Sequence, residues 1–319
     1  MSAPRRVRRD EPVVDLGVDV GPLHLPAPIV AASGTFGHGD EVARLGDPAR
    51  LGAVTAKSVS PEPWPGKPAP RLHMTPGGML NAVGLQGPGV AAWIEHDLPA
   101  LRATGARVVA SIWGTSVDDF ARAARMLLPA RAELVGLEVN VSCPNVHARD
   151  EMFAHDAAAT RTVMAAVADA GLGLPLLAKL SPNVTDIVAI ARAALEGGAD
   201  ALTLVNTVMA LGIDAETRRA VLGAGGGGLS GPAIKPIALR AVHDVTRALP
   251  GVPVVGTGGV RSGVDAVEML LAGASAVGVG TATFLDPRAP YRILDELRDW
   301  CAAHGVVRVR DLTGAMEDR

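Results

Sequence analysis

Short apolar runs alternate with amphipathic stretches along most of the chain. Eight runs rich in β-branched and other apolar residues have the length and continuity of buried strands, at residues 28–32, 53–59, 108–112, 134–141, 176–180, 201–205, 253–256 and 276–279. Apolar positions at helical spacing predict helices at residues 117–128, 157–170, 184–196, 233–249, 264–271 and 291–304. This alternation, with near-continuous apolar strands, indicates a parallel sheet that is covered on both faces or closed on itself.

The number of strand–helix units decides between those two arrangements. Eight units in 319 residues favour an α/β fold of the (β/α)8 TIM-barrel class over an open doubly wound sheet. Residues 13–25, with Gly21-Pro22 near their end, predict an N-terminal β-hairpin that caps the barrel floor. Long loops follow strand two (60–88), strand four and strand six (207–231), and such loops lie on the catalytic face of a barrel.

Composition sets the domain organisation and excludes several functions. We expect a flexible basic arm at residues 1–12 and a single catalytic domain over 13–319, because no change of composition marks a second domain. A net charge of −3 gives no nucleic-acid footprint, and two cysteines indicate a reducing, cytoplasmic environment rather than a disulfide framework. No apolar run suits a signal peptide or a membrane span, and no HxxxH, HExxH or CxxC spacing predicts a metal site.

The segment most suggestive of chemistry is Asn140-Val-Ser-Cys-Pro-Asn145. It follows a predicted buried strand and contains one of the two cysteines and two of the five asparagines in the chain. A thiol held between amide side chains at a strand end can remove a proton or attack a carbon atom. The residues alone leave both roles open for Cys143.

Other polar residues and glycines follow the predicted strands and would meet at the barrel mouth. They are Ser33, Lys57, Ser111, Asn140, Cys143, Asn145, Lys179, Asn206, Thr207, Gly258, Gly259, Gly280 and Thr281. Two lysines suggest an anionic ligand, either a substrate carboxylate or a reduced cofactor. Glycines after strands seven and eight predict a site for a phosphate group or a phosphorylated cofactor. Residues 81–86, which contain the only glutamine of the chain, are expected to fold back over the ligand.

Together, these motifs resemble those of class 1 dihydroorotate dehydrogenases, and most closely the FMN-containing catalytic subunit of type 1B. The matching segments span residues 32–37, 57–58, 78–86, 140–146, 179–187, 206–207, 227–236, 256–259 and 272–277, in order along the chain. The resemblance implies an FMN-containing barrel that oxidises dihydroorotate to orotate in pyrimidine biosynthesis. It also implies that Cys143 is the base that takes the C5 proton while hydride passes from C6 to the flavin.

The same resemblance implies two sets of ligand contacts. The substrate contacts are Lys57, Asn81, Ala82, Val83, Gly84, Leu85, Asn140, Asn145, Asn206 and Thr207. The FMN contacts are Ser33, Lys57, Ser58, Asn140, Lys179, Val205, Gly231, Gly258, Gly259, Gly280 and Thr281. The chain departs from the family pattern at Ser111, where an asparagine that contacts FMN is usual, and at 146–150, where a Gly-Gly pair is usual.

The electron acceptor and the substrate range remain open at this level. Type 1A enzymes use fumarate, whereas type 1B enzymes form a heterotetramer with an FAD and iron–sulfur subunit that reduces NAD⁺. We expect a homodimer, and whether it joins such a subunit in a heterotetramer is left open. The resemblance disfavours quinone as acceptor, because class 2 enzymes reduce quinone through an N-terminal helical membrane extension and use Ser as the base, whereas this chain has Cys143 and an arm of only a dozen residues. Two alternative functions are a dihydropyrimidine-type flavin oxidoreductase with an altered substrate range and a non-enzymatic barrel that only binds FMN or a partner.

Overall fold

The computed structural model describes residues 13–142 and 153–317. The predicted arm at residues 1–12 and the predicted site residues Cys143 and Asn145 lie outside the described residues. Within the described part, no helix has the length and apolar character needed to cross a membrane.

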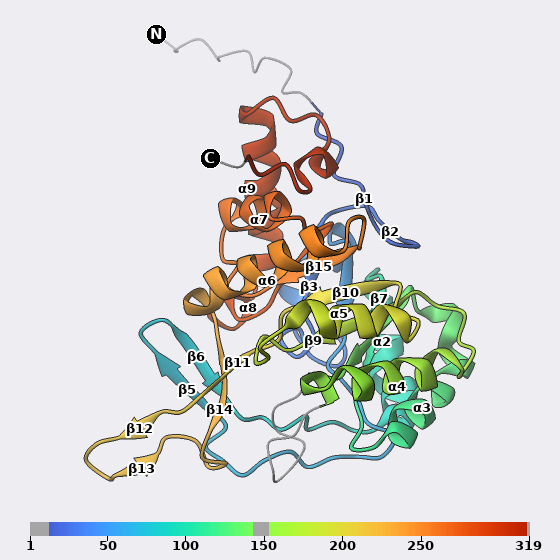
Figure 1. The fold of residues 1–319 in the computed structure, drawn as a ribbon, viewed down its shortest axis with the longest axis vertical. Coiled ribbons are helices and arrows are strands. Elements are labelled where there is room, and N and C mark those ends of the chain that lie inside the picture. Colours follow the sequence, from blue (N-terminus) through green and yellow to red (C-terminus); the bar gives the residue numbers. More distant parts are fainter. Residues whose placement is uncertain (1–12, 143–152, 318–319) are drawn as a thin grey trace.

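The core of the molecule is a closed barrel of eight strands, and it confirms the predicted fold class (Figure 1). Every neighbouring pair in the barrel is parallel. Its strands are β3 (Ile29–Ala31), β4 (Ala53–Thr55), β7 (Val108–Ile112), β8 (Gly136–Asn140), β9 (Leu176–Leu180), β10 (Ala201–Leu204), β15 (Val254–Thr257) and β16 (Ala276–Val279). Each of the eight predicted strand runs contains most or all of one of these strands, because strands covered by helices outside and packed side chains inside need apolar residues on both faces.

Helices cover the outside of the barrel. The six predicted helices correspond to α3 (Val117–Met126), α4 (Ala157–Ala168), α5 (Ile187–Glu196), α6 (Lys235–Ala248), α7 (Gly263–Leu271) and α9 (Ala289–Ala303). Helix α5 begins three residues later than predicted because Asp186 caps it and accepts a hydrogen bond from the Ala189 N–H. Sequence periodicity missed α1 (Val90–Ala92), a following π-helical turn (Trp93–Asp97), α2 (Leu98–Ala103) and α8 (Ala282–Leu285). The π turn shifts the helical spacing, and the other three elements are short.

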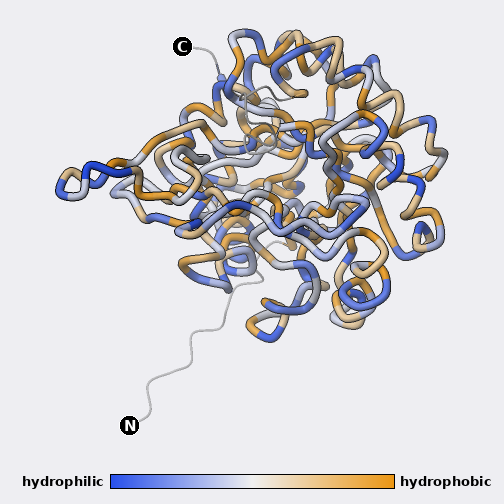
Figure 2. Tube along the Cα trace, turned by 90° about the horizontal axis from the view of Figure 1, so that it is seen from below, coloured by the Kyte–Doolittle hydropathy of each residue, from blue (hydrophilic) through white to orange (hydrophobic). Residues whose placement is uncertain are grey.

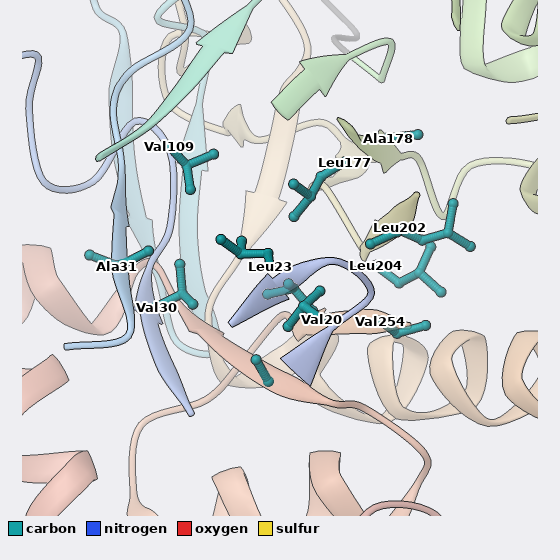
Figure 3. Packing of buried hydrophobic residues seen from close by; sticks show 14 of the residues in the cluster. Val20, Leu23, Val30, Ala31, Val109, Leu177, Ala178, Leu202, Leu204 and Val254 are labelled. Carbon is teal, nitrogen blue, oxygen red and sulfur yellow. The ribbon is translucent and has the colours of Figure 1, made fainter. Parts of the chain in front are cut away.

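The predicted hairpin covers the floor of the barrel. It consists of β1 (Val18–Val20) and β2 (Leu23–Leu25), joined by a turn in which Gly21 has a φ of +60°. A Cβ at Gly21 would lie 3.0 Å from the carbonyl oxygen of Asp200, which immediately precedes β10. Figure 3 shows Val20 and Leu23 among the buried barrel side chains, so the hairpin closes the end opposite the strand C-termini.

The long connections after the second and sixth barrel strands contain strands of their own. Strands β5 (Leu72–Thr75), β6 (Gly78–Asn81), β11 (Val208–Ala210) and β14 (Gly227–Ser230) form an antiparallel sheet in the order β11-β14-β6-β5, here called the mouth sheet. A short pair, β12 (Ile213–Asp214) and β13 (Arg219–Ala220), extends it into a projecting arm (Figure 1) with a hydrophilic tip (Figure 2).

Candidate functional site

A cavity of about 420 Å³ opens where the C-terminal ends of the barrel strands meet the mouth sheet. This volume is within the ~300–1,000 Å³ typical of sites for small molecules and cofactors. Seventeen of the predicted contact residues line it: Ser33, Lys57, Ser58, Asn81, Val83, Gly84, Leu85, Asn140, Lys179, Val205, Asn206, Thr207, Gly231, Gly258, Gly259, Gly280 and Thr281. The predicted substrate and cofactor contacts therefore gather in one place.

Among the predicted substrate and FMN contacts that the structure describes, Ala82 alone does not line the cavity. Its side chain is fully buried and packs in a small cluster with Leu80 and Leu222, behind the mouth sheet. Its backbone N–H donates to the carbonyl oxygen of Arg71 at 2.8 Å. Alternation along an extended segment explains the difference, because Asn81 and Val83 face the cavity and the residue between them faces away.

Amide side chains are held in fixed positions on one wall. The Asn140 side-chain amide donates to Ser58 Oγ at 3.2 Å, and its Oδ1 accepts from Ser142 Oγ at 3.1 Å. The Asn206 amide donates to Ser142 Oγ at 2.9 Å and to Asn140 Oδ1 at 3.4 Å. The sequence analysis did not identify Ser142. This residue directly precedes Cys143, and its hydroxyl bonds both to Asn140, at the end of β8, and to Asn206.

The mouth sheet and the segment that follows β10 also line the cavity. The Asn81 side-chain amide donates to the carbonyl oxygen of Gly228 at 3.3 Å, across the β6–β14 pair. The Asn183 amide donates to the carbonyl oxygen of Thr207 at 2.9 Å, and its Oδ1 accepts from the Met209 N–H at 2.8 Å. These hydrogen bonds fix the positions of Asn81 and Thr207, two of the predicted substrate contacts.

The glycines at the ends of strands β15 and β16 provide a cradle suited to a phosphate group. Gly258 and Gly259 have φ values of +136° and +75°, and Gly231 on the facing segment has +96°, so all three adopt conformations that favour glycine. Gly280 has no other atom closer than 3.8 Å to a Cβ built on it, which leaves its backbone accessible from the cavity. Thr257 Oγ1, beside this cradle, is buried and has no hydrogen-bond partner within the described residues. The accessible glycine backbone fits the phosphate end of FMN.

Two lysines bring positive charge to the cavity. Lys57 donates its backbone N–H to the carbonyl oxygen of Gly37 at 3.0 Å, and burial together with the Lys57 charge lowers the pKa of the neighbouring His38. Lys179 is 6% exposed, and its Nζ lies 3.7 Å from Oε1 of Glu138. The apolar cavity and these two cations fit the ring of a flavin and an anionic substrate.

Glu138 is a buried carboxylate that sequence reasoning missed. It lies within β8 and is 3% exposed. The available signal was a charged residue inside the otherwise apolar run at 134–139. Ser111, the departure noted above, does not line the cavity, and its Oγ lies 2.8 Å from Ser58 Oγ and 3.3 Å from Glu138 Oε1.

The outer rim of the cavity is apolar and exposed. Leu72 and Met74 on β5, and Phe284 and Leu285 on α8, all line it and are 50% to 70% exposed. The sequence carried no signal for this rim, because exposure of an apolar side chain is decided by the surrounding tertiary structure. No group of three or more potential metal ligands occurs among residues 13–142 and 153–317.

Comparison with known proteins agrees with this geometry. Residues 15–300 match the family described as dihydroorotate dehydrogenase. The dihydroorotate dehydrogenase B (NAD(+)), catalytic subunit, of Pelobacter propionicus is 46% identical over 95% of this chain and 99% of its own length. Proteins of the same description from Trichlorobacter lovleyi and Geobacter metallireducens are 46% and 44% identical, over 95% of this chain and 98% of their own lengths. The chain therefore belongs to the dihydroorotate dehydrogenase family, as its motifs predicted.

Proposed function

We propose that this protein oxidises (S)-dihydroorotate to orotate in the de novo synthesis of UMP, as the FMN-containing catalytic component of a type 1B enzyme. The observation that carries the proposal is the single cavity that brings together asparagine amides, two lysines and a glycine cradle. Relatives of nearly the same length bear the description dihydroorotate dehydrogenase B (NAD(+)), catalytic subunit, which supports it.

Each group of residues has a role in this proposal. Bound FMN supplies the hydride acceptor. The amides of Asn81, Asn140 and Asn206 can donate to and accept from the edge of a pyrimidine ring, which a charged side chain cannot do. Lys57 attracts the substrate carboxylate, and Lys179 stabilises negative charge on the reduced ring. The glycine cradle holds the phosphate.

We assign the role of general base to Cys143, which lies outside the described residues. The proton at C5 is weakly acidic because it is next to a carbonyl group, and a thiol has an unperturbed pKa of ~8.5 that nearby cations lower. The preceding residue, Ser142, is held in place by a hydrogen bond from the Asn206 amide.

Replacement of the thiol tests the assignment. Cys143→Ser should retain FMN but slow anaerobic flavin reduction by dihydroorotate by ~10²–10⁴-fold, the usual contribution of a general base. Cys301→Ser is the matched control, because it replaces the other thiol of the chain, which is buried in α9. Unchanged reduction in Cys143→Ser, or a colourless protein, would contradict the assignment.

The alternative substrate class is tested in the same experiment. Dihydrouracil lacks the carboxylate that Lys57 is proposed to bind, so it should reduce the flavin far more slowly than dihydroorotate. Faster reduction by dihydrouracil would favour the dihydropyrimidine-type alternative. No reduction by either compound would favour a barrel that only binds FMN or a partner.

We further propose that the chain forms a homodimer that joins an FAD and iron–sulfur subunit in a heterotetramer, with NAD⁺ as final acceptor. The chain has only two cysteines, too few for the ~four thiolates of an iron–sulfur cluster. The names of the relatives include NAD(+) and catalytic subunit. We propose, in addition, that residues 13–319 form a single catalytic domain and that the protein is located in the cytoplasm. Purification with and without a co-expressed partner subunit, followed by an NAD⁺ reduction assay, tests the assembly.

A further inference from the structure

Beneath the cavity, the Glu138 carboxylate on β8 is held by hydroxyl groups from the adjacent strand β7 and from β10, which lies two strands away around the barrel. Its Oε1 accepts from Ser111 Oγ on β7 at 3.3 Å, and its Oε2 accepts from Thr203 Oγ1 on β10 at 3.1 Å. Glu138 itself does not line the cavity. Both carboxylate oxygens are thus bound inside the barrel, where an isolated charge would be strongly unfavourable.

The charge partner of this carboxylate is Lys179, which does line the cavity. The two side chains are 4% and 8% exposed, and Nζ and Oε1 are 3.7 Å apart. A buried ion pair is a weak stabiliser, because loss of hydration offsets most of the attraction between the charges. A pair of apolar side chains would fill the same space with less loss of hydration, so stability alone does not account for a carboxylate at this position.

A directed series of hydrogen bonds joins the carboxylate to the substrate side of the cavity. Asn140 Nδ2 donates to Ser58 Oγ at 3.2 Å, and Ser58 Oγ lies 2.8 Å from Ser111 Oγ, which donates to Glu138. Because Ser111 has one proton and gives it to the carboxylate, the Ser58 hydroxyl is the donor in the middle bond. The Glu138 carboxylate, as the final acceptor, therefore favours the orientation of the Asn140 amide in which its Nδ2 points to Ser58.

We propose that Glu138 is a positioning residue that holds Lys179 at the flavin ring and, through its negative charge, lowers the reduction potential of the bound flavin. The proposal rests on the proposed function, since it requires FMN in the cavity. Lys179 favours the reduced ring, which carries more negative charge. The Glu138 carboxylate opposes that effect, so its neutralisation should make reduction easier.

The test is the midpoint potential of the bound flavin, measured by anaerobic reductive titration with a reference dye and therefore independent of turnover. Glu138→Gln keeps the shape and removes the charge. It should favour the reduced form by roughly tenfold, a positive shift of about 30 mV for a two-electron couple. Thr203→Val keeps the charge and should leave the potential within a few millivolts of that of the unmodified protein.

A matched control is Asp265→Asn. Asp265 is also a buried carboxylate paired with a lysine, with Lys235 Nζ at 2.6 Å from its Oδ1, but it belongs to the outer helical layer. Its replacement should leave the potential unchanged. An equal shift in Asp265→Asn would mean that loss of any buried charge alters the flavin, and would overturn the specific role of Glu138.

An unchanged or more negative potential in FMN-loaded Glu138→Gln would also overturn the proposal. If Glu138→Gln does not fold, Glu138→Asp provides the second measurement. Its carboxylate lies one methylene farther from Lys179, so a smaller positive shift is expected and an unchanged potential refutes the inference. The unmodified protein distinguishes failure of this inference from failure of the proposed function. If the unmodified protein does not bind FMN, or if its flavin is not reduced by dihydroorotate, the proposed function itself is contradicted.

Discussion

Gly228→Ala is expected to impair substrate handling while the flavin stays bound. Gly228 lies in β14, at the centre of the mouth sheet, where it pairs with Asn81 on one side and Met209 on the other. A Cβ added there would lie 2.1 Å from Oγ1 and 2.6 Å from Cβ of Thr207. Real Cβ atoms do not approach other atoms closer than about 3.0 Å, so Thr207 must move by about 1 Å.

The displacement of Thr207 leads to an expected loss of unfolding free energy and an expected loss of reaction rate. Overpacking of this kind costs ~1–3 kcal/mol of unfolding free energy. A displacement of ~1 Å at a substrate contact costs ~10²-fold in rate. Thr207 lines the cavity, and the Asn81 amide donates to the Gly228 carbonyl oxygen, so both predicted substrate contacts are disturbed by one methyl group.

The assay is stopped-flow reduction of the bound flavin by dihydroorotate, with flavin content and urea unfolding measured on the same preparation. Gly226→Ala is the matched control, since a Cβ there meets only the Ala210 carbonyl oxygen, at 3.4 Å. The control should reduce at the rate of the unmodified protein. Equal rates for the two variants would refute the argument that contact with Thr207 limits residue size at position 228.

Three further predictions follow from the contacts described above. Thr203→Val leaves Oε2 of Glu138 without its hydroxyl donor and should lower the unfolding free energy by ~1–3 kcal/mol in urea titrations. Burial opposes ionisation of Asp265, but hydrogen bonds, above all from Lys235, hold its pKa below the ordinary 3.8. The resulting stability is present above pH 3.8 and is lost as the pH falls through the lowered pKa, so Asp265→Asn should flatten acid unfolding curves in that range. Gly258→Ala should weaken FMN binding at least tenfold in fluorescence titrations, because its φ of +136° disfavours any side chain.

The sequence by itself determined the barrel and most of the site. Parallel strands buried on both faces must be nearly continuous in apolar residues, so all eight could be located from local composition. Polar residues after such strands meet at one end of a closed barrel, which is why residues as distant as Ser33 and Thr281 could be assigned to one cavity.

The tertiary structure decided what depends on pairing between distant segments. The strands β6 and β14 are separated by about 145 residues and are short and rich in glycine, so their antiparallel pairing has no local signal. The pairing of β14 with β11 places Gly228 against Thr207, and the pairing of β14 with β6 fixes which face of the segment at Asn81 and Ala82 is turned away from the cavity. The role of Glu138 likewise became visible only when closure of the barrel brought Ser111, Thr203 and Lys179 around it, because a carboxylate inside an apolar strand is interpretable only through the partners that bind it.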